Sequence, residues 1–199
     1  MTVDQQGSRR VGDRVEALLT ELAPLRGRDG VVRGFERTVG DEVQAVLDDS
    51  ALVVEISLRL LRLGGWSVGI GAGAVDEPLP LSSRAGSGEA FVLARTAVER
   101  AKSRTRPVPL AVASHDAERG RDAEAVLALL GTVISRRRPA GWAVVDALGR
   151  FGAGARQDEV AAALGVTQQA VSQRLRTAMW AEEVAARPVA ARLLDEGDR

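Results

Sequence analysis

Residues 157–178 constrain the fold more than any other segment, because their apolar residues, one glycine and one threonine have the spacing of two short helices joined by a tight turn. The first helix would bury three apolar side chains: Val160, Ala161 and Leu164. Gly165 follows where the chain must turn sharply, a position that favours a residue tolerating positive φ. Thr167 can then cap a second helix beginning at Gln168, since its hydroxyl can accept a hydrogen bond from a backbone N–H in the next turn.

The second of these helices has one apolar face and one polar face. Val171 and Leu175, spaced i and i+4, are expected to turn inward together with Val166. The outward positions carry no acidic residue and comprise Thr167, Gln168, Gln169, Ser172, Gln173 and Arg176, with Arg174 near the flank. Gln can pair bidentately with adenine and Arg with guanine, whereas Ser and Thr can hold phosphate oxygens. The pattern therefore predicts a helix-turn-helix whose second helix reads the major groove of double-stranded DNA.

The sequence of the turn and second helix, Gly165-Val-Thr-Gln-Gln-Ala-Val-Ser172, resembles the DNA-binding helix-turn-helix of bacterial regulators. Two alternatives stay open: an ordinary helical hairpin with a glycine turn, and a module that binds protein, as in an interaction adaptor. Recognition helices usually work in pairs, because a dimer spans two half-sites about 34–36 Å apart. We therefore expect a homodimer, paired through the N-terminal domain, the apolar face of residues 122–138 or the C-terminal tail.

Composition excludes several classes of site. The chain has 199 residues, of which 45% are hydrophobic, and this suffices for one large or two small domains. It has no cysteine and a single histidine, His115, which argues against disulfides, zinc fingers and histidine triads. Its formal charge is zero, so DNA binding would need a local patch. The sequence contains neither an apolar run of roughly 18–20 residues nor a signal core, which predicts a cytoplasmic protein with no membrane partner.

The chain is predicted to form two domains, an α+β domain over residues 1–115 and an all-α domain over residues 120–199. The expected strands cover residues 31–35, 43–47, 66–75 and 108–113, the first two as a hairpin about Gly40-Asp41, and glycines in the third predict close approach by other backbone. The expected helices cover residues 11–22, 51–63, 89–103, 122–138, 142–151 and, around Pro188, 181–194. The run Arg136–Arg138 could touch phosphates, but we expect a solvated helix end.

Three segments of the N-terminal half resemble the nucleotidyl cyclase fold, and in particular the SatD-like family built on it. Asp4 stands three residues before Gly7, the hairpin 35–47 carries the Gly40-Asp41 turn, and the glycine-rich segment 66–75 precedes the run 88–95. Together they cover most of residues 1–113. The resemblance implies a ferredoxin-like sheet with helices for this domain.

The same resemblance implies a ligand site. Asp4 and Asp41, with Glu42 beside them, could hold Mg²⁺, which bridges to nucleotide phosphates. Gly7 would let backbone N–H groups approach those phosphates, and the implied ligand is a purine nucleotide. Further implied nucleotide contacts are Arg37, where related cyclases carry a purine-selecting lysine, and Arg95. The alternative for Asp41 is that it merely occupies a hairpin turn, where aspartate is common. The alternative for Asp4 is that it lies in a frayed terminus, and for this residue we favour the alternative.

The cyclase pattern is incomplete where catalysis needs it. No asparagine accompanies Arg95 on its helix, and Val39 and Val43 break the Gly-Gly-Asp-Glu-Phe signature of diguanylate cyclases. Loss of charge-neutralising groups predicts little turnover, so we expect no enzyme activity and no required cofactor, although nucleotide binding stays open. The leading hypothesis is a dimeric DNA-binding transcriptional regulator with a degenerate cyclase-like domain that senses a ligand or mediates pairing. The alternatives are a metal-dependent purine nucleotide cyclase or nucleotidyl transferase, and a protein-interaction adaptor.

Overall fold

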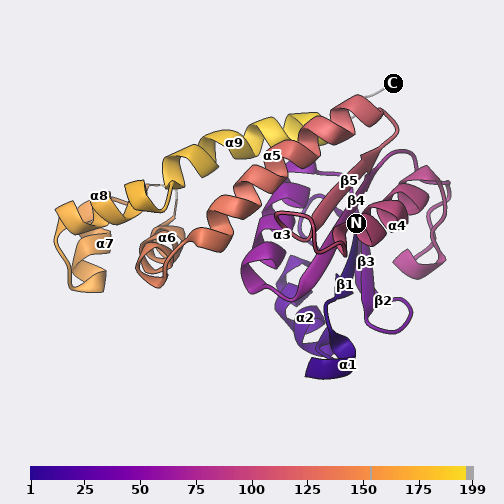
Figure 1. The fold of residues 1–199 in the computed structure, drawn as a ribbon, viewed down its shortest axis with the longest axis horizontal. Coiled ribbons are helices and arrows are strands. Elements are labelled where there is room, and N and C mark those ends of the chain that lie inside the picture. Colours follow the sequence, from indigo (N-terminus) through magenta and orange to yellow (C-terminus); the bar gives the residue numbers. More distant parts are fainter. Residues whose placement is uncertain (153, 196–199) are drawn as a thin grey trace.

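The computed structural model of the chain describes residues 1–152 and 154–195 (Figure 1). These residues form a mixed α+β fold in which one five-stranded sheet is combined with helices. The strands are β1 (Thr2–Gln5), β2 (Val31–Arg37), β3 (Glu42–Leu47), β4 (Trp66–Ala72) and β5 (Leu110–Ser114). The α-helices are α1 (Ser8–Val11), α2 (Val15–Leu22), α3 (Ser50–Leu63), α4 (Glu89–Ala101), α5 (Ala117–Arg136), α6 (Pro139–Phe151), α7 (Gln157–Leu164), α8 (Gln168–Thr177) and α9 (Trp180–Leu194). Two 3₁₀ turns, η1 (Ala23–Leu25) and η2 (Ser83–Ala85), complete the described elements.

The sheet has the strand order β2-β3-β1-β4-β5. Strand β1 lies between β3 and β4 and is antiparallel to both, with Val3 opposite Val43 on one side and Val68 on the other. Strand β2 pairs antiparallel with β3, and only the β4–β5 pair is parallel within the described residues. Because β1 is hydrogen-bonded on both edges, the interpretation that Asp4 lies in a frayed terminus is wrong.

The two faces of the sheet are covered differently. Alternation along β4 turns Val68 and Ile70 toward the main hydrophobic core, which includes residues of α2, α3, α5 and α9. Gly69 and Gly71 turn to the other face, where α4 packs. A Cβ atom at Gly71 would lie 2.2 Å from the carbonyl oxygen of Ala90, so α4 can approach only because these positions lack side chains. The predicted close approach of other backbone to this strand is confirmed.

The two larger hydrophobic clusters differ in the elements that they join. The larger core joins strand residues to α5 and α9, through Leu127, Leu130, Ile134, Ala190 and Leu194 among others. The smaller core joins only α6, α7 and α8. The long helices α5 and α9 run side by side along one edge of the molecule, and the α6–α8 unit lies at their far end (Figure 1). The segment from residue 120 onward therefore contributes helices to both cores.

Most predicted elements are confirmed, with shifted ends. The expected helix over residues 11–22 is split into α1 and α2, because Gly12 adopts a φ of 80° between them. The expected helix over residues 122–138 begins earlier, at Ala117, since the side chain of Asp116 accepts hydrogen bonds from the N–H groups of Glu118 and Arg119. Pro188 lies inside α9, as expected for the tail.

Candidate functional site

Helices α7 and α8 are joined by three residues whose geometry matches the predicted turn. Gly165 ends α7 in the left-handed conformation, with φ 62° and ψ 36°. Thr167 precedes α8 in an extended conformation, and its hydroxyl accepts a hydrogen bond of 3.1 Å from the N–H of Ala170. The predictions of a left-handed glycine turn and a threonine cap are both confirmed.

The apolar sides of these helices pack on α6. The fully or almost fully buried members of this small core are Val144, Ala147, Val160, Ala161 and Val171. Partly buried residues that pack against it include Leu164, Val166 and Leu175, all of which the spacing predicted to face inward. The polar face of α8 is thereby directed outward.

The outward face of α8 is polar and basic. Five of the predicted DNA-contacting residues are exposed, namely Thr167, Gln168, Gln169, Gln173 and Arg176, and the other two, Ser172 and Arg174, are half-buried. The acids that precede α8 lie at the start of α7 and are engaged locally: Asp158 pairs with Arg156 at 3.0 Å, and Glu159 accepts the Arg156 backbone N–H at 3.0 Å. The acids that follow α8 are Glu182 and Glu183, in the first turn of α9. The outward face of α8 itself carries no carboxylate that would repel a polyanion.

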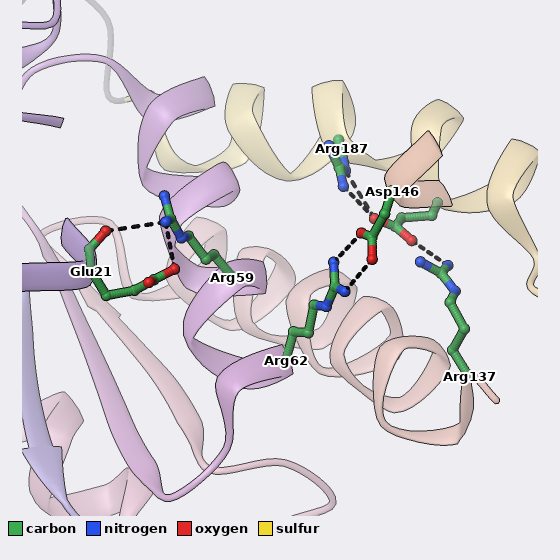
Figure 2. A network of polar contacts seen from close by, with 7 residues as sticks. Glu21, Arg59, Arg62, Arg137, Asp146 and Arg187 are labelled. Atoms are coloured by element: carbon green, nitrogen blue, oxygen red, sulfur yellow. Dashed lines mark hydrogen bonds and ion pairs between the residues drawn. The ribbon is translucent and has the colours of Figure 1, made fainter. Parts of the chain in front are cut away.

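A buried ion-pair network joins this unit to the rest of the molecule (Figure 2). Arg137, which follows α5, donates hydrogen bonds to the carboxylate of Glu183 and to the carbonyl of Ala178, the latter at 2.8 Å. Glu183 also accepts hydrogen bonds from Arg187 within α9. The expectation that Arg136–Arg138 is solvated is therefore wrong for Arg137, whose side chain is completely buried. Its guanidinium carbon lies 4.5 Å from the ring centroid of Trp142.

Only two residues, Ala178 and Met179, separate α8 from α9. Met179 lies between the two helices with a φ of 51°, which is uncommon for a residue other than glycine. The preceding carbonyl, that of Ala178, is the one that Arg137 holds. The orientation of α8 is thus tied to α5 and α9 at a point next to its own C-terminus.

A second contact fixes α6 to α3. Arg62 and Asp146 form a bidentate ion pair with N···O distances of 2.6 and 2.7 Å (Figure 2). The Arg62 guanidinium carbon also lies 3.8 Å from the ring centroid of Trp142. Hydrogen bonding from Arg62 lowers the pKa of Asp146 below its ordinary value.

The carboxylates implied by the cyclase resemblance lie on the α4 face of the sheet. Asp4 stands directly opposite Glu42 across the β1–β3 pair. Each forms an ion pair with a basic side chain from α4 or its C-terminal cap. The Nζ of Lys102 lies 3.1 Å from Oδ2 of Asp4, and Nη1 of Arg95 lies 2.9 Å from Oε2 of Glu42. Burial raises the pKa of Asp4 above its ordinary value, and the negative charges of Asp41 and Glu42 act in the same direction, against the effect of Lys102.

The remaining residues of the implied nucleotide site form hydrogen bonds within the protein. Arg37 donates hydrogen bonds to Asp13 and to the carbonyl of Gly40. Gly7 has a φ of 67° and precedes α1, and its carbonyl accepts hydrogen bonds from the N–H groups of Arg10 and Val11. In residues 1–152 and 154–195, no group of three or more Asp, Glu, His or Cys side chains is arranged to hold a metal ion. For Mg²⁺ to bind, Asp4 and Glu42 would have to release Lys102 and Arg95.

A half-open pocket of about 460 Å³ lies at the opposite end of the sheet. It is bordered by the end of β3, the end of β4 and the first turns of α3 and α4, and its lining includes Gln44, Asp48, Gly71, Phe91 and Leu194. Asp4, Asp41 and Glu42 do not line it. This pocket and the implied carboxylate site are therefore separate features of the fold.

Comparisons of the chain with protein-family models, with curated proteins and with solved structures found no match. Among the described helices, none is both long enough and apolar enough to cross a membrane.

Proposed function

We propose that the chain is a DNA-binding transcriptional regulator in which α7 and α8 form a helix-turn-helix and α8 enters the major groove. The observation that carries this proposal is the outward face of α8, which exposes glutamine and arginine side chains and no acid, while its opposite face is packed on α6 and α7. Threonine and serine side chains can contact phosphates, and α8 offers Thr167 at its N-terminus and Ser172. Glutamine side chains can read base edges, and α8 offers Gln169 and Gln173.

The formal charge of zero supports local and specific contacts over nonspecific electrostatic binding. A single recognition helix reads few base pairs, so the proposal includes a homodimer that spans two half-sites. We further propose that this regulator acts in the cytoplasm.

Selection of bound duplexes from a random pool, using the full chain, tests this proposal. The expected result is an enriched, two-fold symmetric sequence. The control is a variant with Gln169→Ala and Gln173→Ala, which keeps the buried face of α8 and should lose the enrichment. Recovery of no enriched sequence by the wild-type chain contradicts the proposal.

We also propose that the sheet is a ferredoxin-like, degenerate relative of the nucleotidyl cyclase fold, of the SatD-like type, and serves sensing or pairing. The order β2-β3-β1-β4, with antiparallel neighbours throughout, supports the ferredoxin-like assignment. The ion pairs Lys102–Asp4 and Arg95–Glu42 occupy the carboxylates that a metal would need, which supports a noncatalytic role. Incubation with ATP or GTP and Mg²⁺, followed by product analysis, tests it: turnover that is abolished by Asp41→Asn contradicts the noncatalytic role.

A further inference from the structure

Helix α9 has one buried side and one exposed side. Its buried residues, Glu183, Ala190, Ala191 and Leu194, lie on the side that packs against α3 and α5. The exposed residues lie on the opposite side of the helix and are Ala181, Glu182, Val184, Ala185, Pro188, Val189 and Arg192. We call these seven residues the outer stripe. Its middle is apolar, and Val184 and Val189 remain 46% and 37% exposed.

The charged residues of the outer stripe lie at its two ends. Glu182 is in the first turn of α9 and Arg192 in the last, and neither forms an ion pair within the described part of the chain. Arg192 lies ten positions after Glu182 on the helix, which corresponds to a rise of about 15 Å. The stripe is therefore complementary to a second copy of itself in the antiparallel direction. In that arrangement, Glu182 of each copy faces Arg192 of the other, and Ala185 faces Val189.

A parallel arrangement would oppose like charges at both ends, which disfavours it. An antiparallel pair has two-fold symmetry, and in such an interface the same surface of both subunits is used. Burial of Val184 and Val189 would supply the apolar contact of the interface, in addition to the charge pairs at its two ends.

We propose that the outer stripe of α9 is the homodimer interface, with the second copy antiparallel. This inference rests on the proposed function, because the purpose of the dimer is to present two α8 helices to two half-sites of DNA. Since α9 follows α8 after a break of only two residues, the first residues of the two α9 helices would lie about 21 Å apart along their axis. The two α8 helices then extend beyond these points, toward the half-site spacing of about 34–36 Å.

Sedimentation velocity of the full chain without DNA tests the interface. The wild-type chain should be a dimer, and Val184→Glu or Val189→Glu should raise the dissociation constant of the dimer at least about tenfold. The matched control is Val92→Glu, since Val92 is 67% exposed on α4, on the other face of the sheet. Circular dichroism should show that all three variants keep their helix content. A monomeric wild-type chain, or a Val189→Glu variant as dimeric as the wild type, overturns the proposal.

Charge exchange tests the antiparallel direction. Glu182→Arg and Arg192→Glu should each weaken the dimer, and the double variant should recover it, because the two opposite charges again face each other. A double variant as weak as the singles overturns the antiparallel arrangement. Because no DNA is present, a chain that dimerises as expected but selects no duplex would contradict only the proposed DNA binding.

Discussion

Arg137 and Glu183 form an ion pair in which both side chains are almost completely excluded from solvent. The pair joins the residue after α5 to the first turn of α9, 46 positions later in the sequence. A buried pair of this kind adds little net stability compared with well-packed apolar residues, but breaking it leaves an uncompensated charge. Since Arg137 also holds the carbonyl of Ala178, the pair defines how α8 is oriented relative to the sheet.

Glu183→Gln is expected to destabilise the protein by about 3–5 kcal/mol, because it leaves the buried guanidinium of Arg137 without its counter-charge. Urea unfolding followed by circular dichroism measures this loss. Asp122→Asn is the control, since Asp122 is an exposed acid on α5, outside the outer stripe of α9, and its effect should stay within about 0.5 kcal/mol.

The double variant Arg137→Met with Glu183→Leu should recover much of the stability that Glu183→Gln loses, because it removes both buried charges together. If Glu183→Gln unfolds at the same urea concentration as Asp122→Asn, the Arg137–Glu183 pair does not have the role described above.

Local features of the fold could be predicted from the sequence, whereas contacts between distant segments could not. Gly165 and Thr167 act on the backbone beside them, so their conformations followed from residue type. Strand β1 was harder to predict because Asp4 and Gln5 make it look polar, and its burial comes from pairing on both edges. An apolar helical stripe such as that of α5 does not say which neighbour covers it, so its place in the sheet core required the structure.

The candidate site shows the same division. Residue types and helical spacing sufficed to predict which side of α8 faces outward. Arg137 was missed because a basic run at a helix end is usually solvated, and its partner is far away in the chain. The one available signal was Glu183, an acid on the side of α9 that otherwise carries Ala190, Ala191 and Leu194.

Asp146 should make the stability of the protein depend on acidic pH. Its folded pKa is lowered below the ordinary value of 3.8 by hydrogen bonding from Arg62, so its stabilising contribution is present above that value and is lost as the pH falls through the folded pKa. Asp146→Asn should therefore lower the melting temperature slightly at pH 6. Below pH 4, the melting temperature of this variant should fall less steeply with pH than that of the wild type. Both side chains are about two-fifths exposed, which limits the effect at neutral pH to about 0.5 kcal/mol.

Thermal unfolding between pH 6 and pH 2 measures this dependence. The control is Asp122→Asn, because Asp122 is an exposed acid on α5 for which the described residues provide no ion pair. An Asp146→Asn variant whose acid profile is as steep as that of the control would show that the Arg62–Asp146 pair does not contribute.

Gly71→Ala should destabilise the sheet by about 2 kcal/mol, because the added Cβ would lie 2.2 Å from the carbonyl oxygen of Ala90 and 2.3 Å from the nitrogen of Ala94. Chemical denaturation measures the change. Gly149→Ala is the matched control: a Cβ atom at this position in α6 meets no atom within 4 Å, so the substitution should stabilise the helix by about 0.5–1 kcal/mol. Equal effects at the two glycines would contradict the close packing of α4 on β4.

Single substitutions on α8 should separate base reading from phosphate binding. Gln169→Ala and Gln173→Ala should each relax base preference at one position of the selected duplex, with a loss of discrimination of about 1–3 kcal/mol. Arg176→Ala should instead weaken binding to every duplex and reduce the slope of log affinity against log salt concentration by about one. Fluorescence anisotropy over a salt series measures both effects. Arg104→Ala is the control, since this exposed arginine follows α4, outside the α6–α8 unit. If all three α8 variants bind like the wild type and like this control, α8 is not the recognition helix.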